Sequence, residues 1–286
     1  MTPEFVAEVS SNHGRDLGRA LAFVEAAARI GCATVKFQLF RVDELFAPEI
    51  LAKSPMHRAR AQWELPEAFL APLAARSRAL GIQFACTPFS LRAVDALQPH
   101  VDFYKIASYE LLWDDLLRAC AATGKPVAIA TGMATLDEVT RATNVLRDAG
   151  CADPVVMHCT SGYPTPVDQC NLAAIDTIRA ATGARAGWSD HSVSPAVIYR
   201  AVHRWRAEMV EFHLDLEGKG AEFGAGHCWL PEQIAPVIAA IRAGISADGT
   251  GDKRPVAAEI DDRPWRADPA DGLRPMRSIR STWTPS

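Results

Sequence analysis

The feature that most constrains the fold of this chain is a regular alternation of short apolar segments with amphipathic helical patterns, repeated eight times between residues 5 and 243. Apolar runs of this length indicate strands, and apolar residues at i, i+3 and i+4 indicate helices. The predicted strands are Phe5–Val9, Thr34–Phe40, Ile82–Thr87, Asp102–Ser108, Pro126–Thr131, Pro154–Thr160, Ala184–Ser189 and Glu208–Leu214. The predicted helices are Leu17–Ile30, Pro66–Leu80, Leu91–Leu97, Leu111–Thr123, Leu136–Asp148, Asn171–Thr182, Ser194–Arg204 and Pro231–Ala243.

Eight strand–helix units predict an α/β fold of the (β/α)8 TIM-barrel type, whose usual length is about 250 residues. The alternative is an open doubly wound sheet, but no G-x-G-x-x-G follows the first predicted strand. We therefore expect a catalytic barrel over residues 1–250. Residues 251–286 lack periodicity, and we expect a tail, an arm on a neighbouring chain or a linker remnant, with a disordered terminus as the alternative.

Charge and composition exclude several classes of protein. The net charge is −4 and the Lys and Arg residues are scattered, which disfavours a nucleic-acid partner. No apolar run reaches the roughly 20 residues of a membrane helix, and the N-terminus does not resemble a signal peptide. Seven cysteines without a CxxC pair suit reduced thiols. We expect a cytoplasmic protein that does not contact membranes.

Polar side chains stand at the ends of the predicted strands, and the carboxyl ends of barrel strands meet at one mouth. These residues are Glu8, Asn12, Lys36, Gln38, Thr87, Lys105, Ser108, Glu110, His158, Tyr163, Ser189, His191, Glu211 and His213. Two lysines with nearby hydroxyl groups suit a small phosphorylated acid, because ammonium and hydroxyl groups satisfy phosphate and carboxylate oxygens. Lys36 could instead be a Schiff-base nucleophile.

Two histidines occupy matched positions on neighbouring strands. Side chains alternate along a strand, so Ser189 and His191 share one face, as do Glu211 and His213. The pair suits a divalent metal such as manganese, magnesium, cobalt or iron, although strand-end histidines are commonly structural, and both interpretations stay open. His158 precedes Cys159 and points to the opposite face, so we expect a structural hydrogen bond there.

The chain resembles the sialic acid (N-acetylneuraminate) synthase family of phosphoenolpyruvate-dependent nonulosonic acid synthases. The resemblance runs in order through residues 5–245. Its motifs are Ala7-Glu8-Val9-Ser10-Ser11-Asn12-His13, Val35-Lys36-Phe37-Gln38, Thr87-Pro88-Phe89, Lys105-Ile106-Ala107-Ser108, Thr131-Gly132-Met133, His158-Cys159, Tyr163-Pro164, Ser189-Asp190-His191 and Glu211-Phe212-His213.

The resemblance implies a role for each site residue. His191 and His213 would hold the metal, commonly Mn²⁺, with Mg²⁺ or Co²⁺ as alternatives, and the metal would polarise the aldehyde of an open-chain aldose. Phosphoenolpyruvate would be held by Lys36, Thr87, Lys105, Ser108 and Ser189. The sugar would lie near Gln38, Glu110 and Tyr163. The catalytic centre would include Glu8 and Glu211, either of which could move protons or orient water.

This sequence also departs from the family pattern. Ala130 stands where a serine hydroxyl is usual, and Phe212 replaces a lysine that alternation places toward the helices. Glu222 is the best match for a family acidic residue, and His227 is an additional candidate. The family usually continues into an antifreeze-like (SAF) domain, whereas this sequence stops at the linker. We therefore expect a different aldose acceptor or a separate SAF-like partner, and a homodimer is an expected assembly.

The sequence is compatible with three functions. The first is condensation of phosphoenolpyruvate with an N-acetylmannosamine-like or other aldose to give a 2-keto-3-deoxy sugar acid. The second is a related 3-deoxy-octulosonate or heptulosonate synthase. The third is a catalytically degenerate partner subunit.

Overall fold

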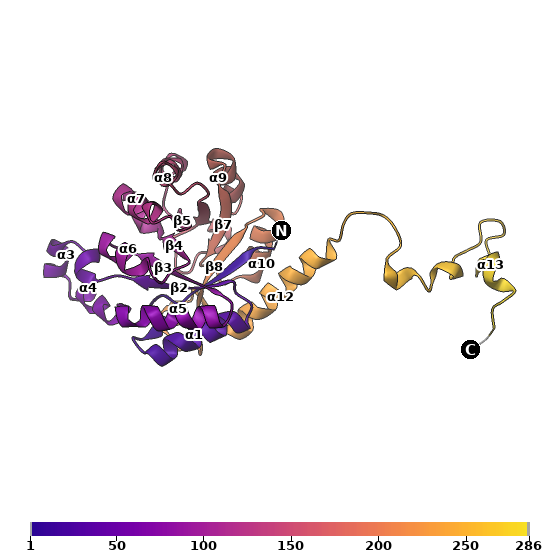
Figure 1. Ribbon diagram of the computed structural model, residues 1–286, viewed down its shortest axis with the longest axis horizontal. Coiled ribbons are helices and arrows are strands. Elements are labelled where there is room, and N and C mark those ends of the chain that lie inside the picture. The colour runs from indigo at the N-terminus through magenta and orange to yellow at the C-terminus, as the bar shows by residue number, and fades with distance from the viewer. Residues whose placement is uncertain (1, 285–286) are drawn as a thin grey trace. The chain divides into compact units, whose positions relative to one another are not determined.

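Eight parallel strands close into a barrel in the computed structural model, which describes residues 2–284 (Figure 1). They are β1 (Glu4–Glu8), β2 (Thr34–Leu39), β3 (Gln83–Pro88), β4 (Phe103–Ile106), β5 (Val127–Ala130), β6 (Val155–Cys159), β7 (Arg185–Asp190) and β8 (Met209–Leu214). Each strand pairs with the next, and β8 pairs back to β1 with His213 opposite Glu8. The predicted (β/α)8 barrel is confirmed. A short ninth strand that the sequence did not predict, β9 (Cys228–Trp229), pairs in parallel with the end of β8.

The main helices pack around the strands (Figure 1). They are α1 (Leu17–Arg29), α5 (Leu70–Ala79), α6 (Leu91–Leu97), α7 (Asp114–Ala122), α8 (Leu136–Asp148), α9 (Ala174–Thr182), α10 (Pro195–Tyr199) and α12 (Pro231–Ala247). Local side chains fix several starts: the Asp16 carboxylate accepts from the amide of Arg19, and Thr135 with Glu138 forms a capping box.

Several helix limits differ from the sequence prediction. Helix α7 begins at Asp114 and not at Leu111, and helix α12 continues to Ala247 and not only to Ala243. Helix α5 is preceded by a 3₁₀ turn at Glu67–Phe69. Helix α9 begins only at Ala174, since the left-handed backbone of Asn171 (φ 44°) interrupts a helix before that point. The predicted helix over residues 194–204 is α10 followed by a π-helical turn at Arg200–Arg204. These ends depend on backbone geometry that apolar periodicity does not encode.

The long segment between β2 and α5 folds into short helical pieces. They are α2 (Val42–Leu45), α3 (Pro48–Lys53), α4 (Pro55–Ala59) and a 3₁₀ turn at Arg60–Trp63. Its ends are tied together because the Glu64 carboxylate accepts from the amide of Val42 at 2.8 Å and from Arg41 at 3.2 Å. These contacts hold the segment in place at the carboxyl end of β2.

The inward-facing side chains of the strands divide into an apolar layer and an ionic layer. The apolar layer, near the amino ends, contains Val6, Ala85, Phe103, Ala128, Val155, Met157 and Met209. Two residues further along β1, β4 and β8, the same inward face carries Glu8, Lys105 and Glu211. Burial of each large apolar side chain contributes about 1.5–3 kcal/mol, so the apolar layer helps to offset the cost of burying charges above it.

Residues 246–284 group apart from the barrel, which extends to Ile245. Within this segment, Asp271 forms ion pairs with Arg277 and Arg280, and the rings of Trp265 and Trp283 meet edge to face at 5.9 Å. It contains short turns at Ala257–Glu259 and Arg263–Trp265 and helix α13 (Arg277–Arg280). The domain limits predicted from the sequence stay a prediction.

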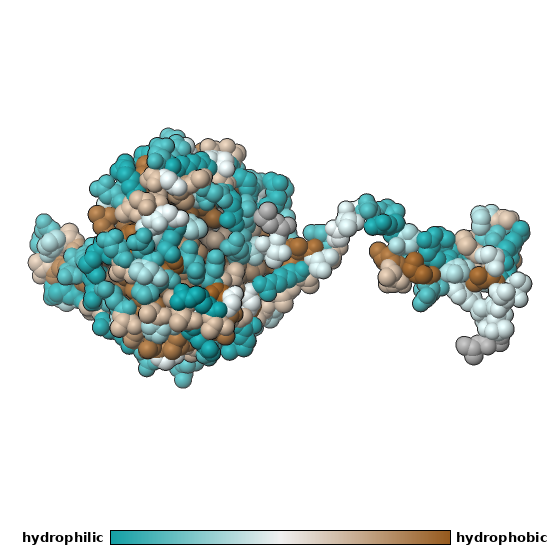
Figure 2. Space-filling view, in the orientation of Figure 1, coloured by the Kyte–Doolittle hydropathy of each residue, from teal (hydrophilic) through white to brown (hydrophobic). Residues whose placement is uncertain are grey.

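The surface view in Figure 2 shows hydrophilic residues over most of the visible barrel face, with apolar residues scattered among them. Among residues 2–284, no helix combines the length and apolar character that crossing a lipid bilayer requires.

Candidate active site

The ionic layer consists of two lysines and two glutamates inside the upper barrel: Glu8, Lys36, Lys105 and Glu211. The Lys36 ammonium forms an ion pair with Glu8 Oε2 and lies 3.5 Å from Glu211 Oε1. Lys105 Nζ lies 3.3 Å from the same Glu211 oxygen. One carboxylate thus faces both lysines, and all four side chains are almost completely buried.

Electrostatic coupling keeps these groups charged despite burial. Burial alone would lower the pKa of Lys36, but Glu211 and Glu8 outweigh it and raise that pKa. Burial would likewise raise the pKa of Glu211, but Lys105 and Lys36 outweigh it, so that pKa is lowered. A fifth polar group joins the layer, because Lys36 donates to the Thr87 hydroxyl at 3.1 Å. The layer therefore presents two ammonium groups that an anionic ligand can contact.

A hydroxyl-rich recess lies beside Lys105, at the ends of β4, β5 and β6. The Ser108 hydroxyl accepts from the amide of Gly132 at 3.0 Å and lies 3.2 Å from Cys159 Sγ. A Cβ on Gly132 would collide with Ser161 Oγ, so glycine is required there. Sequence reasoning missed Ser161, whose buried hydroxyl has no partner among the described residues. Its position after β6 was the available signal.

Ser161 bears on the departure at Ala130. The family resemblance predicts that a serine hydroxyl is missing at position 130, and the Ala130 methyl group is buried at the end of β5. The Ser161 hydroxyl now occupies the neighbouring space near Gly132. Ser189, at the end of β7, is buried opposite Glu211 and Cys159 in the strand register. Hydroxyl groups are therefore available on both sides of the ionic layer.

Above the ionic layer, a cavity of about 760 Å³ opens at the mouth of the barrel. We call it the mouth cavity; its lining residues include Gln38, Phe46, Arg60, Trp63, Glu110, Tyr163, His213, Glu222 and His227. Gln38 Nε2 donates to Glu8 Oε1 at 2.7 Å, which links the cavity to the ionic layer. Burial raises the pKa of Glu110 to about 7, and one of its oxygens has no partner among the described residues. Glu110 can thus exchange a proton near neutral pH.

His191 and His213 meet at one side of this cavity, with ring centres 5.4 Å apart. His191 Nδ1 lies 2.8 Å from the Thr160 carbonyl, which can only accept, so Nδ1 carries the hydrogen. Burial, with a smaller contribution from His213, lowers the pKa of His191 to about 3. The neutral ring therefore has a free lone pair on Nε2.

His213 is oriented in the same way by a carboxylate. Its Nδ1 lies 2.9 Å from Glu222 Oε2. Burial lowers the pKa of His213, but the hydrogen bond and the negative charge of Glu222 outweigh it and raise that pKa. Nδ1 donates to Glu222, which leaves Nε2 of this ring as the nitrogen that a cation could bind.

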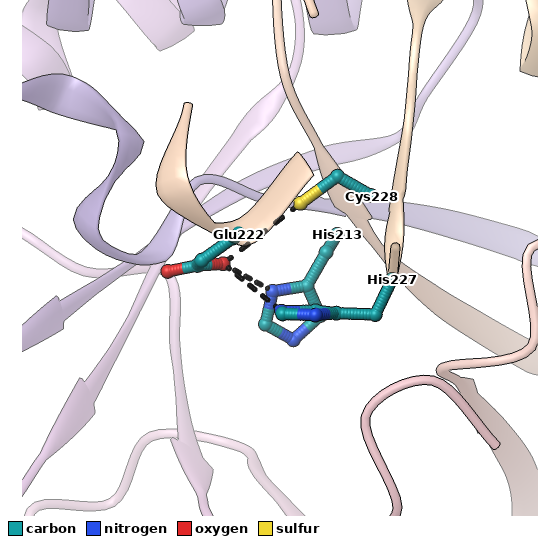
Figure 3. Close-up of side chains that lie close together, drawn as sticks. All are labelled: His213, Glu222, His227 and Cys228. Carbon is teal, nitrogen blue, oxygen red and sulfur yellow. Dashed lines mark hydrogen bonds and ion pairs between the residues drawn. The ribbon is translucent and has the colours of Figure 1, made fainter. Parts of the chain in front are cut away.

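The loop after β8 places Glu222 beside His213 (Figure 3). Asp215 accepts from the amides of Lys219 and Gly220 at 2.9 and 3.1 Å, and Arg19 pairs with its other oxygen. A Cβ on Gly220 would lie 2.6 Å from Asn12 Oδ1, so only glycine permits this close approach. The loop then turns into helix α11 (Ala221–Gly224), which carries Glu222.

Two polar residues near His191 and His213 have different roles. Asp190, beside His191, accepts hydrogen bonds from the indoles of Trp188 and Trp229, so it supports the outer packing. His227, in contrast, lies in the site: its Nε2 is 3.6 Å from Glu222 Oε2 (Figure 3). His158 hydrogen-bonds the Cys170 carbonyl at 3.0 Å, which confirms its expected structural role.

The structure therefore brings the predicted site residues together at one end of the barrel. Those at the mouth or in the ionic layer are Glu8, Lys36, Gln38, Thr87, Lys105, Ser108, Glu110, Tyr163, Ser189, His191, Glu211, His213 and Glu222. Their chemical roles stay predictions. A divalent cation fits the donor set, because two imidazoles expose Nε2 and a third buried ring, that of His227, has an Nδ1 without a partner among the described residues.

Comparison with known proteins agrees with this arrangement. The model of the NeuB family matches residues 23–253. An uncharacterized protein of Methanocaldococcus jannaschii is 34% identical over 263 residues, covering 91% of this chain and 76% of that protein. The N,N'-diacetyllegionaminic acid synthase of Legionella pneumophila is 31% identical over 280 residues, covering 91% of this chain and 77% of the synthase.

Among solved structures, the N-acetylneuraminic acid (sialic acid) synthetase of Leptospira borgpetersenii superposes with a TM-score of 0.80 at 27% identity. The match covers 92% of this chain and 90% of that chain. These named relatives confirm the prediction of an enzyme of the synthase class and leave its sugar undetermined.

Proposed function

We propose that this chain, which belongs to the NeuB family, condenses phosphoenolpyruvate with an open-chain aldose to give a 2-keto-3-deoxy sugar acid and phosphate. One observation carries the proposal: two buried lysines face a single carboxylate, directly below two histidines that expose Nε2. The first half of this arrangement suits a small polyanion, and the second suits a cation beside an aldehyde.

The binding of phosphoenolpyruvate rests on charge and hydroxyl groups. Lys36 and Lys105 would contact the carboxylate and phosphate, and Ser108, Thr87 and Ser189 would donate hydrogen bonds. Glu8 and Glu211 already balance both lysines, so the ionic layer alone has no excess positive charge. A divalent cation at His191 and His213 would add two positive charges, which favours binding of the polyanion.

The proposed reaction forms one C–C bond and breaks one C–O bond. C3 of phosphoenolpyruvate attacks the aldehyde carbon with the electrons of its double bond, and water adds to the resulting cationic C2. One proton of this water goes to the aldehyde oxygen, which becomes a hydroxyl. Phosphate then leaves with the electrons of the C–O bond and takes the proton of the C2 hydroxyl, which leaves the 2-keto group. When bound, the cation, which we expect to be Mn²⁺, Mg²⁺ or Co²⁺, would polarise the aldehyde. Glu8 and Glu211 are candidates to orient water and to take its proton, since both lie beside the lysines that hold the enol phosphate.

The sugar would occupy the mouth cavity, where Gln38, Tyr163 and Glu110 offer polar contacts. Glu110 is suited to protonate or deprotonate a sugar hydroxyl, because burial brings its pKa to about 7. The relatives named for legionaminic and N-acetylneuraminic acids favour an acylamino aldose as the acceptor. A 3-deoxy-octulosonate or heptulosonate synthase is the alternative, and phosphorylated aldoses distinguish it.

The test is phosphate release from phosphoenolpyruvate by the purified metal-loaded chain, with a panel of acylamino and phosphorylated aldoses, and product masses by mass spectrometry. Aldose-dependent phosphate release with a product heavier than the aldose by one pyruvate is expected. Release only with a phosphorylated pentose or tetrose would favour the alternative. No release with any aldose, despite bound metal, would contradict the proposal and favour a degenerate subunit.

The assembly and cellular location are also proposals. We propose a cytoplasmic homodimer, or a pair with a separate SAF-like protein, in which residues 251–286 form the connecting arm. The segment exposes Val256, Ile260 and Leu273, which supports a contact with another chain. Sedimentation of the full chain and of a variant shortened after residue 250 tests this. We expect the shortened variant to lose the dimer, and a variant that still contains two chains per particle would contradict the proposal.

A further inference from the structure

We propose that His227 is a third imidazole ligand, so that this chain would hold its divalent cation through His191, His213 and His227. Glu222 would then be a positioning residue that orients the rings without binding the ion. The inference rests on the metal-dependent function proposed above and concerns which residues hold the metal. Sequence resemblance implied only two of these histidines as ligands.

The spacing of the rings supports one shared ion. The ring centres of His191 and His213 are 5.4 Å apart, and those of His213 and His227 are 5.0 Å apart. An imidazole nitrogen binds a first-row metal at about 2.1 Å, so two rings on one ion have centres about 5 Å apart. The Tyr163 ring lies beside all three imidazoles, with ring centres 4.1, 6.0 and 5.1 Å from those of His191, His213 and His227. Ligand atoms of His213 and His227 lie within 4.8 Å of each other, and His191 adjoins this pair through its contact with His213.

His227 also has a nitrogen that calls for a partner. Its Nδ1 is buried and has no hydrogen-bond partner among the described residues, and its side chain is only 9% exposed. A buried polar atom without a partner costs about 1–3 kcal/mol, so a ligand at this atom removes a real penalty. The backbone next to His227 is held in place, because Cys228 begins β9 and pairs with His213 of β8.

Glu222 has no oxygen left for a cation. Its Oε1 accepts from the Ser11 amide at 3.1 Å and from the Ser11 hydroxyl at 2.7 Å. Its Oε2 accepts from His213 Nδ1 at 2.9 Å, with His227 Nε2 at 3.6 Å (Figure 3). A carboxylate that holds the far nitrogen of a metal-binding histidine is a common supporting arrangement around protein metal ions.

Cys228 is close to the same group but is not assigned as a ligand. Its Sγ accepts from Asn12 Nδ2 at 3.6 Å and faces Glu222 Oε2 at 3.9 Å. Both contacts engage the sulfur within the described residues, and Figure 3 shows it directed toward the Glu222 carboxylate. A set of three imidazoles without thiolate favours Fe²⁺, Co²⁺ or Zn²⁺ over Mg²⁺, because imidazole is a borderline ligand.

The test measures metal binding directly, without the reaction. The metal-free full chain is titrated with Co²⁺ against a competing chelator, and the cobalt absorption spectrum and metal content are recorded. The variants are His227→Ala, His227→Gln, His213→Ala and Glu222→Gln, with His100→Ala as the matched control at a histidine outside the site. Thermal melting followed by circular dichroism identifies any variant that fails to fold. If His227→Ala fails to fold, the result rests on His227→Gln, which preserves more of the side-chain volume.

We expect one cobalt ion per chain in the wild type and in His100→Ala. Both His227 variants should bind at least about tenfold more weakly with a changed visible spectrum, and Glu222→Gln should weaken binding about 10- to 100-fold with the spectrum retained. A near-ultraviolet cobalt–thiolate band would overturn the assignment by placing Cys228 on the ion.

If His213→Ala loses cobalt while His227→Ala retains wild-type affinity and spectrum, His227 is not a ligand, and the proposed function is unaffected. If the wild type binds no divalent ion while phosphate release still requires an aldose, the metal inference fails and the condensation stands. If neither metal nor turnover is found, both fail.

Discussion

Both ends of the barrel contain ion pairs between basic and acidic side chains, but the pair partners are partly exposed at the amino end and buried at the carboxyl end. At the amino end, Arg185 pairs with Glu4 and Glu208, and the side chains of Arg185 and Glu4 are 34% and 38% exposed. At the carboxyl end, Lys36 pairs with Glu8, and their side chains are 3% and 1% exposed. Each end has a cavity, of about 350 Å³ at the amino end and about 760 Å³ at the mouth.

The difference indicates where the chemistry lies. Exposed ion pairs cost little and contribute little, at most about 1 kcal/mol. Buried ion pairs cost several kcal/mol of desolvation, and a fold retains them where they have another use. Of the two ends, within residues 2–284, only the mouth combines buried charges with histidines and partly unsatisfied polar atoms, including Glu110 Oε2 and Ser161 Oγ.

The largest expected effect is on turnover. His213→Ala removes a proposed metal ligand, and metal polarisation of a carbonyl is worth several kcal/mol. We expect kcat to fall by at least about 10³-fold, whereas His100→Ala should retain full activity. Initial rates of phosphate release under metal saturation provide the measurement. Retention of wild-type kcat in His213→Ala would remove the distinction between the mouth and the rest of the molecule.

The next effect separates the two ends by stability. Lys36→Met leaves Glu8 and Glu211 buried beside one fewer cation, so we expect the free energy of unfolding to fall by about 3–5 kcal/mol. Arg185→Met should lower it by no more than about 1 kcal/mol. Urea denaturation at pH 7 measures both values. Equal losses for the two variants would show that burial of the pairs does not distinguish them.

A third variant pair compares one lysine from each end. Lys105→Met removes a proposed contact with phosphoenolpyruvate, and a charge-assisted hydrogen bond is worth about 1.5–3 kcal/mol. We expect KM for phosphoenolpyruvate to rise about 10- to 100-fold. Lys125, whose Nζ donates to the Val101 carbonyl at the amino end, is the control, and Lys125→Met should leave KM unchanged. An unchanged KM in Lys105→Met would mean that this lysine does not contact the substrate.

The smallest effect concerns pH. The folded pKa of Glu110, about 7, lies above its usual 4.5, so the folded chain holds the proton more tightly than the unfolded chain. Glu110 therefore destabilises the fold progressively as pH rises from about 4.5 to about 7, and the penalty is complete above pH 7. We expect Glu110→Gln to remove about 1–2 kcal/mol of this pH dependence, after allowance for partial solvent access. Parallel pH profiles for the two proteins in urea denaturation would contradict it.

Strand alternation predicted most of the fold and most of the site membership. Period-two patterns placed Lys36, Glu211 and His213 on inward faces, and the parallel barrel then brought their ends together. The sequence could not predict that Glu211 faces both lysines, because that contact depends on strand stagger across the barrel. Ser161 and the hydrogen bond between Glu222 and His213 were also missed, since both depend on loop paths.

The most direct test of the account is a crystal structure of the full chain with Mn²⁺ and phosphoenolpyruvate. The account predicts the phosphoenolpyruvate anion in contact with Lys36 and Lys105 and the metal bound by His191 and His213 at the mouth. An anion bound instead in the amino-end cavity beside Lys125 and Arg185, with the mouth unchanged, would contradict it.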